Sequence, residues 1–292
     1  MLEIKNLSKS YGKTAVLKDI NLKLEQNKIY GLLGRNGIGK TTLLNIISNQ
    51  IKSNSGEVLL DSKNVFEDSA TIENIALVKD NGFGIDDIKV KKIFKAAQIL
   101  HKNWDEDYKE FLIKEFKLNI RKNYSKLSRG NQTIVGLIVG LASRAPLTLF
   151  DEPSLGLDAS HRYKFYELLL KDIENNPRTI IISTHLIDEV TNLFEEVIIL
   201  KDESHYLKEE VSSLMDKAYF ISGRLEHMDT VVKEKNIIHK EEFGSTTILS
   251  IFDNLSKEEK EILKENGIDI SGIPLQKLFV LLTEQENIEE VR

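Results

Sequence analysis

The chain has 292 residues, of which 41% are hydrophobic and 29% charged, an ordinary composition for one large or two smaller globular domains. It contains no cysteine, which excludes disulfides and thiolate metal sites and indicates a reducing compartment. A formal net charge of −6 argues against general nucleic-acid binding. We expect no signal peptide and no membrane span, since no apolar run approaches the roughly 20 residues that a span needs.

Alternating segments near the N-terminus predict antiparallel strands. Residues 2–8 and 20–24 place apolar side chains at every second position, as half-buried strands do. The turn between them contains Tyr11, and an aromatic ring beside a nucleotide can stack on its base for about 1–3 kcal/mol. A tyrosine in a turn is by itself more often structural, so this interpretation depends on the motif that follows.

A glycine-rich loop separates the apolar segment 28–33 from the helical pattern of residues 43–48. It fits G-x-x-x-x-G-K-[ST] in a strand–loop–helix setting, which predicts a P-loop. Glycines let backbone N–H groups turn toward a polyphosphate, and the helix start adds a positive dipole end. Lys40 supplies a charge for the β- and γ-phosphates, and the Thr41 hydroxyl is placed to bind Mg²⁺. The predicted nucleotide-binding residues are Gly34, Arg35, Asn36, Gly37, Ile38, Gly39, Lys40, Thr41 and Thr42.

Residues 85–126 are rich in lysine and apolar residues at helical spacing. One predicted apolar face consists of Ile93, Ala96, Ala97 and Leu100, and a second helix includes residues 111–116. We interpret residues 82–126, approximately, as a helical subdomain inserted into the nucleotide-binding core.

The segment 127–132 stands directly before an apolar helix. Ser128 suits an N-cap, and its hydroxyl, the Gly130 N–H and the helix start can together form a second anion site. In isolation, simple helix capping is the better interpretation.

An apolar segment, 147–150, ends in two carboxylates. In P-loop chemistry Asp151 can hold Mg²⁺, often through water, and Glu152 can orient or deprotonate the attacking water. A further apolar strand, 179–183, ends beside His185, which in the same layer can reach a γ-phosphate. Residues 197–200 are predicted to close the core sheet.

Taken in order, these segments resemble the motifs of ABC ATPases over residues 1 to about 205. Residues 34–42, 127–131 and 149–152 are similar to the Walker A, signature and Walker B motifs, Leu157-Asp158 to the D-loop, His185 to the H-loop and Tyr11 to the A-loop aromatic residue. The resemblance implies an α/β fold: a P-loop NTPase of ABC type with a parallel core sheet, an antiparallel β subdomain and an inserted helical subdomain. It implies ATP and Mg²⁺ as cofactors, with Lys40, Glu152 and His185 catalytic, Tyr11, Ser128, Gly130 and Asp158 at the nucleotide, and Thr41, Asp151 and Asp80 at the metal.

Residues 150–159, 165–166 and 177–189 resemble a narrower group, the ATPase subunits of ABC-2-type exporters. This group is often linked to GntR-type regulators and includes the phenol-soluble modulin exporter ATPases. Two features depart from the family pattern. The signature has Arg129 and Asn131 where the family usually has Gly and Gln, and the Q-loop glutamine aligns best with Asp80. A shorter, charged residue there would change how Mg²⁺ is coupled to the helical subdomain.

Beyond about residue 215 the sequence predicts a small α+β module without a catalytic constellation. Strands are expected over 218–222 and 246–252, and helices after residue 254 and over 275–283. The predicted domains are therefore an ATPase domain, 1–214, and an accessory domain, 215–292, which resembles the C-terminal extension of many exporter ATPases.

We therefore expect a peripheral ATPase subunit on the cytoplasmic face of a membrane. It would power a separate transmembrane permease that exports a peptide, toxin or other amphipathic compound, and would pair with a second ATPase subunit. The P-loop of one chain would face Ser128 and Gly130 of the other. Permease docking is expected within residues 82–104, where the apolar candidates are Phe83, Ile85, Ile88, Ile93 and Phe94.

Two other functions are compatible with a P-loop. One is a soluble ABC ATPase acting on a ribosome or nucleic-acid complex, but the chain has neither a second P-loop nor sustained heptads. The other is a P-loop kinase outside the ABC family, against which the signature segment and His185 argue. No nucleic-acid partner is expected.

Overall fold

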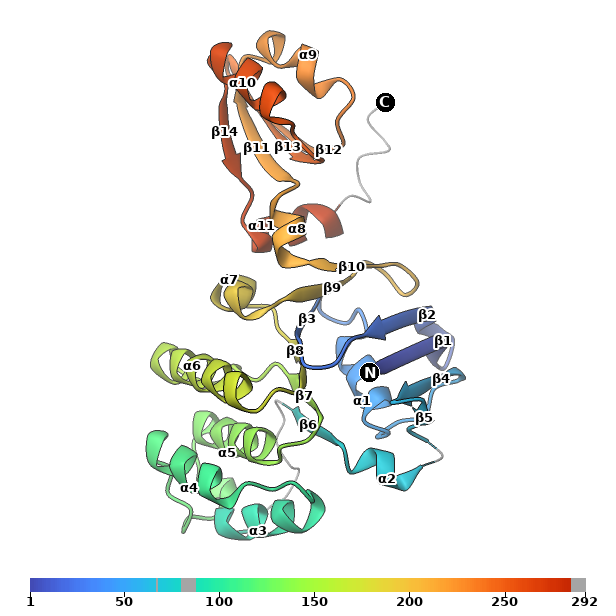
Figure 1. Cartoon of the computed structure of the whole chain (residues 1–292), viewed down its shortest axis with the longest axis vertical. Helices are drawn as coiled ribbons and strands as arrows, with labels where there is room; N and C mark the ends of the chain where they lie inside the picture. The colour runs from blue at the N-terminus through green and yellow to red at the C-terminus, as the bar shows by residue number, and fades with distance from the viewer. Residues whose placement is uncertain (67, 80–87, 285–292) are drawn as a thin grey trace.

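Three β-sheets and the helices around them make up the described part of the chain. The structure is a computed structural model, and it describes residues 1–66, 68–79 and 88–284. In Figure 1 two sheets and most of the helices form a large lower body, and the third sheet forms a smaller upper body above residues 206–215. Within the described ranges, no helix is long and apolar enough to cross a membrane.

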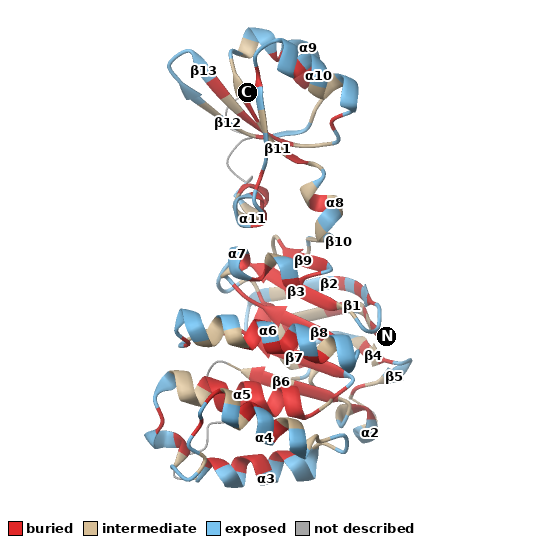
Figure 2. Ribbon diagram, turned by 60° about the vertical axis from the view of Figure 1, so that its left-hand side comes forward, coloured by how far each residue is buried: buried red, intermediate tan, exposed pale blue. Residues whose placement is uncertain are grey.

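The core of the large body is a six-stranded sheet in the order β10-β9-β3-β8-β7-β6. Its neighbouring strands are parallel except for the pair β10 and β9. Strands β3, β7, β8 and β9 are largely apolar and almost wholly buried (Figure 2), as expected for parallel strands covered on both faces. The bounds are β3 Ile29–Gly34, β6 Ile75–Lys79, β7 Leu147–Asp151, β8 Thr179–Ser183, β9 Glu196–Leu200 and β10 Tyr206–Glu210.

The prediction that residues 197–200 close this sheet is wrong, because β10 pairs with β9 and forms the edge. The sequence of β10 is mostly polar and half-exposed, so it carries little strand signal. Charged side chains on an edge strand also oppose pairing with another chain.

The N-terminal strands form a second sheet, antiparallel, in the order β2-β1-β4-β5. The inward-facing side chains of β1 and β2 pack with the helix that follows the P-loop, so this sheet lies against the P-loop side of the core. The bounds are β1 Leu2–Tyr11, β2 Thr14–Leu24, β4 Ser55–Leu60, β5 Lys63–Asn64, α1 Lys40–Ile47 and α2 Ser69–Ile72.

Two long helices cover the other side of the core sheet. A Cβ atom added at Gly140 would come within 2.6 Å of Val78 and 2.8 Å of Phe150, so α5 lies directly on β6 and β7. The rings of Phe150 and Phe165 meet edge to face at 5.5 Å, which joins β7 to α6. The bounds are α5 Arg129–Ala142, α6 Ala159–Asn175 and α7 Ile187–Val190, with 3₁₀ turns η1 Tyr124–Lys126 and η2 Thr191–Leu193.

The helical region contains α3 Val90–Leu100 and α4 Glu106–Glu115, which pack beside α5 at the foot of Figure 1. The predicted apolar face of α3 is partly wrong. Its buried residues are Val90, Ile93, Phe94 and Ala97, whereas Ala96 is exposed and Leu100 is 68% exposed. The buried stripe therefore lies three residues, almost one helical turn, toward the N-terminus of the predicted one.

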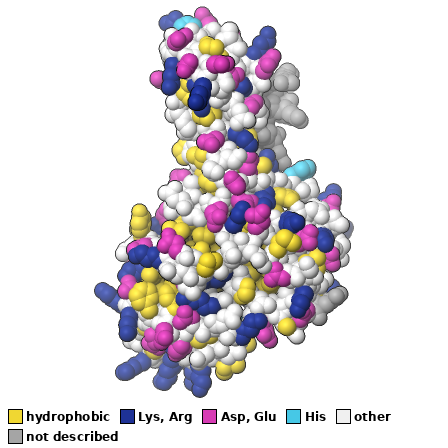
Figure 3. Space-filling model, in the orientation of Figure 1, with side chains coloured by type: hydrophobic (Ala, Val, Ile, Leu, Met, Phe, Trp, Pro, Cys, Tyr) yellow, Lys and Arg dark blue, Asp and Glu magenta, His cyan; other side chains and the backbone are white. Residues whose placement is uncertain are grey.

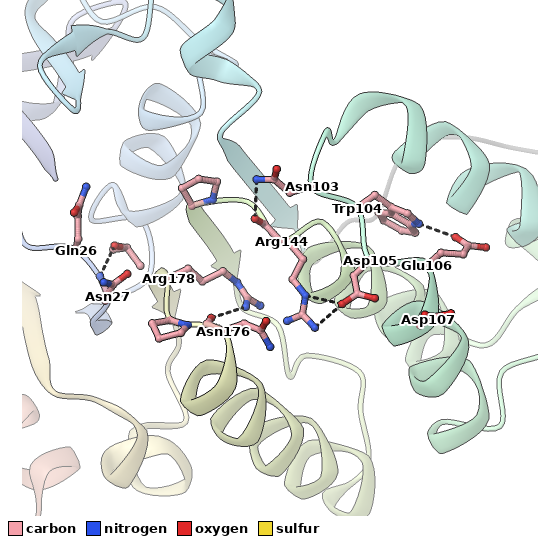
Figure 4. A pocket seen from close by; sticks show the side chains of 13 residues that line it. Gln26, Asn27, Asn103, Trp104, Asp105, Glu106, Asp107, Arg144, Asn176 and Arg178 are labelled. Atoms are coloured by element: carbon pink, nitrogen blue, oxygen red, sulfur yellow. Dashed lines mark hydrogen bonds and ion pairs between the residues drawn. The ribbon is translucent and has the colours of Figure 1, made fainter.

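A buried ionic network joins this helical region to the core. Arg144, which follows α5, pairs with Asp105 at the start of α4 and with Asp172 of α6, and Arg178 pairs with the same Asp172. Burial alone would raise the pKa of Asp105, but hydrogen bonds from the Tyr108 N–H and from Arg144 outweigh it and lower this pKa. Figure 4 shows Arg144 and Asp105 paired. Both residues line an open hollow with a volume of about 800 Å³.

Substituting Asp172 with alanine is expected to lower the free energy of unfolding by about 3–5 kcal/mol, because the buried guanidinium of Arg178 and the partly buried one of Arg144 lose their shared carboxylate. Asp107→Ala, at an exposed side chain in the first turn of α4, should cost about 1 kcal/mol or less. Urea unfolding of both variants measures the difference. Equal costs would mean that the network does not stabilise the fold.

The upper body is an antiparallel sheet in the order β12-β13-β11-β14, with small helices on one face. Its last helix, α11, packs back on the large body: Leu275 and Leu278 share a core with Ile187 and Val190 of α7. The domain boundary after residue 214 stays a prediction, since by packing α11 belongs to both bodies. The bounds are α8 Val211–Met215, β11 Ala218–Gly223, η3 Leu225–His227, α9 Asp229–Val232, β12 Ile237–Phe243, β13 Thr246–Phe252, α10 Lys257–Glu265, β14 Asp269–Gly272 and α11 Leu275–Thr283.

Candidate active site

The P-loop connects β3, in the middle of the core sheet, to α1. Gly37 and Gly39 have φ angles of +83° and +114°, in the left-handed region that favours glycine. A Cβ at Gly39 would also meet Val16 and Leu17 at 3.0–3.1 Å, so packing as well as backbone conformation disfavours any larger residue here. No side chain caps the start of α1, so its N–H groups remain available to an anion.

The Lys40 side chain lies within the loop itself. Its exposed fraction is 7%, and its Nζ donates to the carbonyls of Gly34, at 2.7 Å, and Arg35, at 3.2 Å. Burial lowers the pKa of Lys40, and the nearby carboxylates of Glu152 and Asp151 oppose that shift. The ammonium therefore sits between the P-loop and the carboxylates that follow β7.

Asp151 and Glu152 lie at the carboxyl end of β7, next to the end of β8. Asp151 is buried, and one of its oxygens accepts a 2.6 Å hydrogen bond from the Ser183 hydroxyl on β8. The Glu152 N–H donates to the Ser183 carbonyl and hydroxyl, both at 3.1 Å, while Glu152 has a φ of +51°. A φ in this region is strained for a residue other than glycine, and such strain is commonly found at functional sites.

Glu152 and His185 contact each other directly. The distance between Glu152 Oε2 and His185 Nδ1 is 2.7 Å, and the two side chains are 18% and 48% exposed. A carboxylate that is held by an imidazole at the carboxyl edge of a parallel sheet is well placed to orient a water molecule.

The predicted signature residues lie beside the predicted D-loop. Ser128 is the N-cap of α5 and accepts the Asn131 N–H, and a Cβ at Gly130 would come within 2.8 Å of the Gly156 carbonyl. Thr133 Oγ1 donates to the Leu155 carbonyl at 3.0 Å, which ties the two segments together. Among the described residues, no hydrogen bond or ion pair joins Ser128 or Asp158 to the P-loop of the same chain.

Asp158 is the N-cap of α6. It accepts the His161 backbone N–H at 2.9 Å and also contacts the His161 ring, and these contacts lower the pKa of Asp158. Tyr11 ends β1, is 51% exposed, and has Lys9 Nζ 5.2 Å from its ring centroid. Asp80 lies outside the described residues, directly after β6, so its predicted role in metal binding stays a prediction.

Sequence reasoning missed Ser183, whose hydroxyl and carbonyl position both carboxylates. The available signal was a polar residue at the end of a buried strand. Parallel registration of β7 and β8 sets it opposite Asp151.

This fold and site define a P-loop nucleotide-binding protein with carboxylates and a histidine placed for hydrolysis. A family model described as ABC transporter matches residues 17–155. The chain is 32% identical over 212 residues to the taurine import ATP-binding protein TauB of Escherichia coli O157:H7, with 68% of this chain and 79% of TauB covered. The chain belongs to the ABC transporter ATP-binding proteins and is an ATPase.

Two relatives extend over nearly the whole chain. ABC transporter ATP-binding protein YtrB of Bacillus subtilis (strain 168) is 27% identical, with 96% of this chain and 97% of YtrB covered. Bacitracin transport ATP-binding protein BcrA of Bacillus licheniformis is 26% identical, with 95% and 94% covered. The dimeric, post-hydrolysis structure of the ATP-binding cassette MJ0796 with ADP and Pi is 25% identical, with 72% of this chain and 99% of that chain covered and a TM-score of 0.63.

Proposed function

We propose that this chain is the ATP-hydrolysing subunit of an exporter, working in pairs on the cytoplasmic face of a membrane with a separate transmembrane permease. The observation that carries this proposal is the Glu152–His185 pair beside the P-loop lysine. The similarity to BcrA, which includes the C-terminal module, supports transport of a peptide, toxin or other amphipathic compound as the work that hydrolysis drives.

In this proposal each residue type has one task. The N–H groups of residues 34–42 and the start of α1 hold the β- and γ-phosphates, and Lys40 turns from the loop carbonyls toward them. Glu152 orients the attacking water and takes its proton, while His185 holds Glu152 and reaches toward the γ-phosphate. Tyr11 stacks on the adenine.

The residues present fit a Mg²⁺ ion shared with the nucleotide. Ser183 occupies one oxygen of Asp151, and among the described residues no donor occupies the other. No group of three acidic or histidine side chains that could hold a metal occurs in the described part of the chain. Mg²⁺ commonly takes one or two protein ligands and completes its shell with phosphates and water. Thr41 and Asp151 would hold the ion, which neutralises phosphate charge when bound.

In this proposal each nucleotide site is formed by residues of two chains. Gly130 packs against Gly156 and Thr133 bonds to Leu155, so the signature segment lies beside the D-loop of its own chain. Among the described residues no hydrogen bond or ion pair joins Ser128 to its own P-loop, and we propose that Ser128 and Gly130 serve the nucleotide of a second chain. The dimeric arrangement of the cassette MJ0796 supports this pairing.

Burial narrows the set of apolar residues that we propose for permease docking within residues 82–104. Ile93 and Phe94 are core residues and Ile88 is partly buried, whereas Phe83 and Ile85 lie outside the described residues. Leu100 is 68% exposed at the end of α3 and is the better candidate for an apolar contact.

Leu100→Asp is expected to abolish co-purification of the permease while ATP binding by the isolated chain is unchanged. A charge in an apolar contact loses the burial energy and is desolvated without a partner. Leu170→Asp, on an exposed apolar position of α6, is the matched control and should co-purify normally. Mass spectrometry of the purified complex identifies the permease. Hydrogen-exchange protection confined to residues after 215 would place the docking site elsewhere.

A further inference from the structure

The solvent face of α3 is strongly basic. Val90, Ile93, Phe94 and Ala97 point into the core, and α3 contains no acidic residue. On the opposite face lie Lys91, Lys92 and Lys95, all exposed, and the exposed Lys102 follows just beyond the helix end. Figure 3 shows Lys and Arg side chains gathered along the lower edge of the molecule, where Figure 1 places α3.

Among the residues that the structure describes, these lysines have no acidic partner. Within the described residues, none of the four has a carboxylate within salt-bridge distance, although lysines elsewhere in the chain form many such pairs. The loop beside the start of α3 adds to the charge: the Val90 N–H donates to the Lys122 carbonyl, and Arg121 and Lys122 are exposed.

An isoleucine stands in the middle of this basic face. Ile99 is 77% exposed, and from the helical period it projects within about 80° of Lys91, Lys92 and Lys95. Leu100, the docking candidate, projects about 180° from Lys91 and about 140° from Lys95, so a protein contact at Leu100 leaves these two lysines open.

We propose that this face of α3, defined by Lys91, Lys92, Lys95 and Ile99, binds the surface of an anionic phospholipid membrane. Lysines attract acidic headgroups, and an exposed aliphatic side chain among them inserts at the boundary of the acyl chains. The proposal rests on the proposed function in one respect: an exporter subunit works beside a bilayer.

The charge distribution favours a membrane surface over other anionic partners. The chain as a whole carries a net charge of −6, so an anionic surface repels most of it and selects the basic end. Nucleic acid offers phosphates but no apolar layer for Ile99, and single strands are bound by stacking on aromatic rings, which the solvent face of α3 lacks.

Flotation with vesicles tests this directly, using the full chain without permease or nucleotide. The chain should float with vesicles of phosphatidylcholine mixed with phosphatidylglycerol, not with phosphatidylcholine alone, and less so as salt rises. Lys91→Glu combined with Lys95→Glu should lower the partition coefficient at least about tenfold, since each lysine contributes substantially at an anionic surface. Ile99→Ser should lower it by a smaller factor without changing its salt dependence.

The matched control is Lys257→Glu combined with Lys264→Glu, which makes the same change of net charge at exposed positions of α10. This variant should float like the unaltered chain, and ATP binding should be unchanged in both double variants. Equal losses in both, no flotation of the unaltered chain, or tighter binding of a DNA or RNA oligonucleotide through Lys91 and Lys95 would each overturn the proposal. Because no permease is present, failure here is distinguishable from failure of the exporter function, which co-purification tests.

Discussion

Glu152→Gln is expected to bind ATP normally and to hydrolyse it about 10²–10⁴-fold more slowly, which is the usual loss when a positioned general base is removed. Glutamine keeps the shape of the side chain and can still contact His185, but it cannot take a proton. Because nucleotide binding is retained and hydrolysis is not, a closed dimer should accumulate in the presence of ATP.

The measurements are steady-state phosphate release and size-exclusion chromatography with ATP. Glu167→Gln is the matched control, since Glu167 is an exposed residue of α6 that forms an ion pair with Lys171. It should hydrolyse ATP at the normal rate. If purified Glu152→Gln also turns over at a near-normal rate, another group activates the water.

Mixing Lys40→Ala with Ser128→Ala is expected to restore activity that neither variant has alone. Each substitution damages one half of a composite site, so a mixed dimer keeps one undamaged P-loop facing one undamaged signature segment. The structural reason is that Gly130, in the segment that Ser128 begins, packs against Gly156 beside the D-loop of its own chain, with Lys40 held by the P-loop carbonyls. ATPase activity should therefore peak near equal proportions of the two variants.

A second mixture sets the baseline. Lys40 and Glu152 belong to the same half of the site, so mixing Lys40→Ala with Glu152→Gln leaves no undamaged site and should restore nothing. Ser128→Ala also removes an N-cap, at a cost of about 0.5–2 kcal/mol. Ser128→Asp keeps a capping oxygen and places a charge against the phosphate, so it separates the loss of stability from the loss of the site. Equal activities in both mixtures would show that the site is not shared between chains.

Short-range patterns in the sequence were sufficient to predict many of the strands and several residues of the candidate site. The glycine loop of residues 34–42, the carboxylates after the apolar segment 147–150 and the strands over 218–222 and 246–252 could be predicted, because turn geometry and apolar periodicity act over a few residues. The resemblance to ABC ATPases, now shown by the family match, rested on the order of such local segments.

Contacts between distant segments were decided only by the tertiary structure. Ser183 positions Asp151 and Glu152 because β7 and β8 pair in parallel register. No pattern within residues 179–183 indicates that β8 pairs with β7. The same holds for β10, a mostly polar strand that forms by antiparallel pairing with β9 at the edge of the sheet. Periodicity placed an apolar face on α3 but put Leu100 in it, because a repeat indicates that a helix has a buried side and the elements packed against it decide which residues are covered.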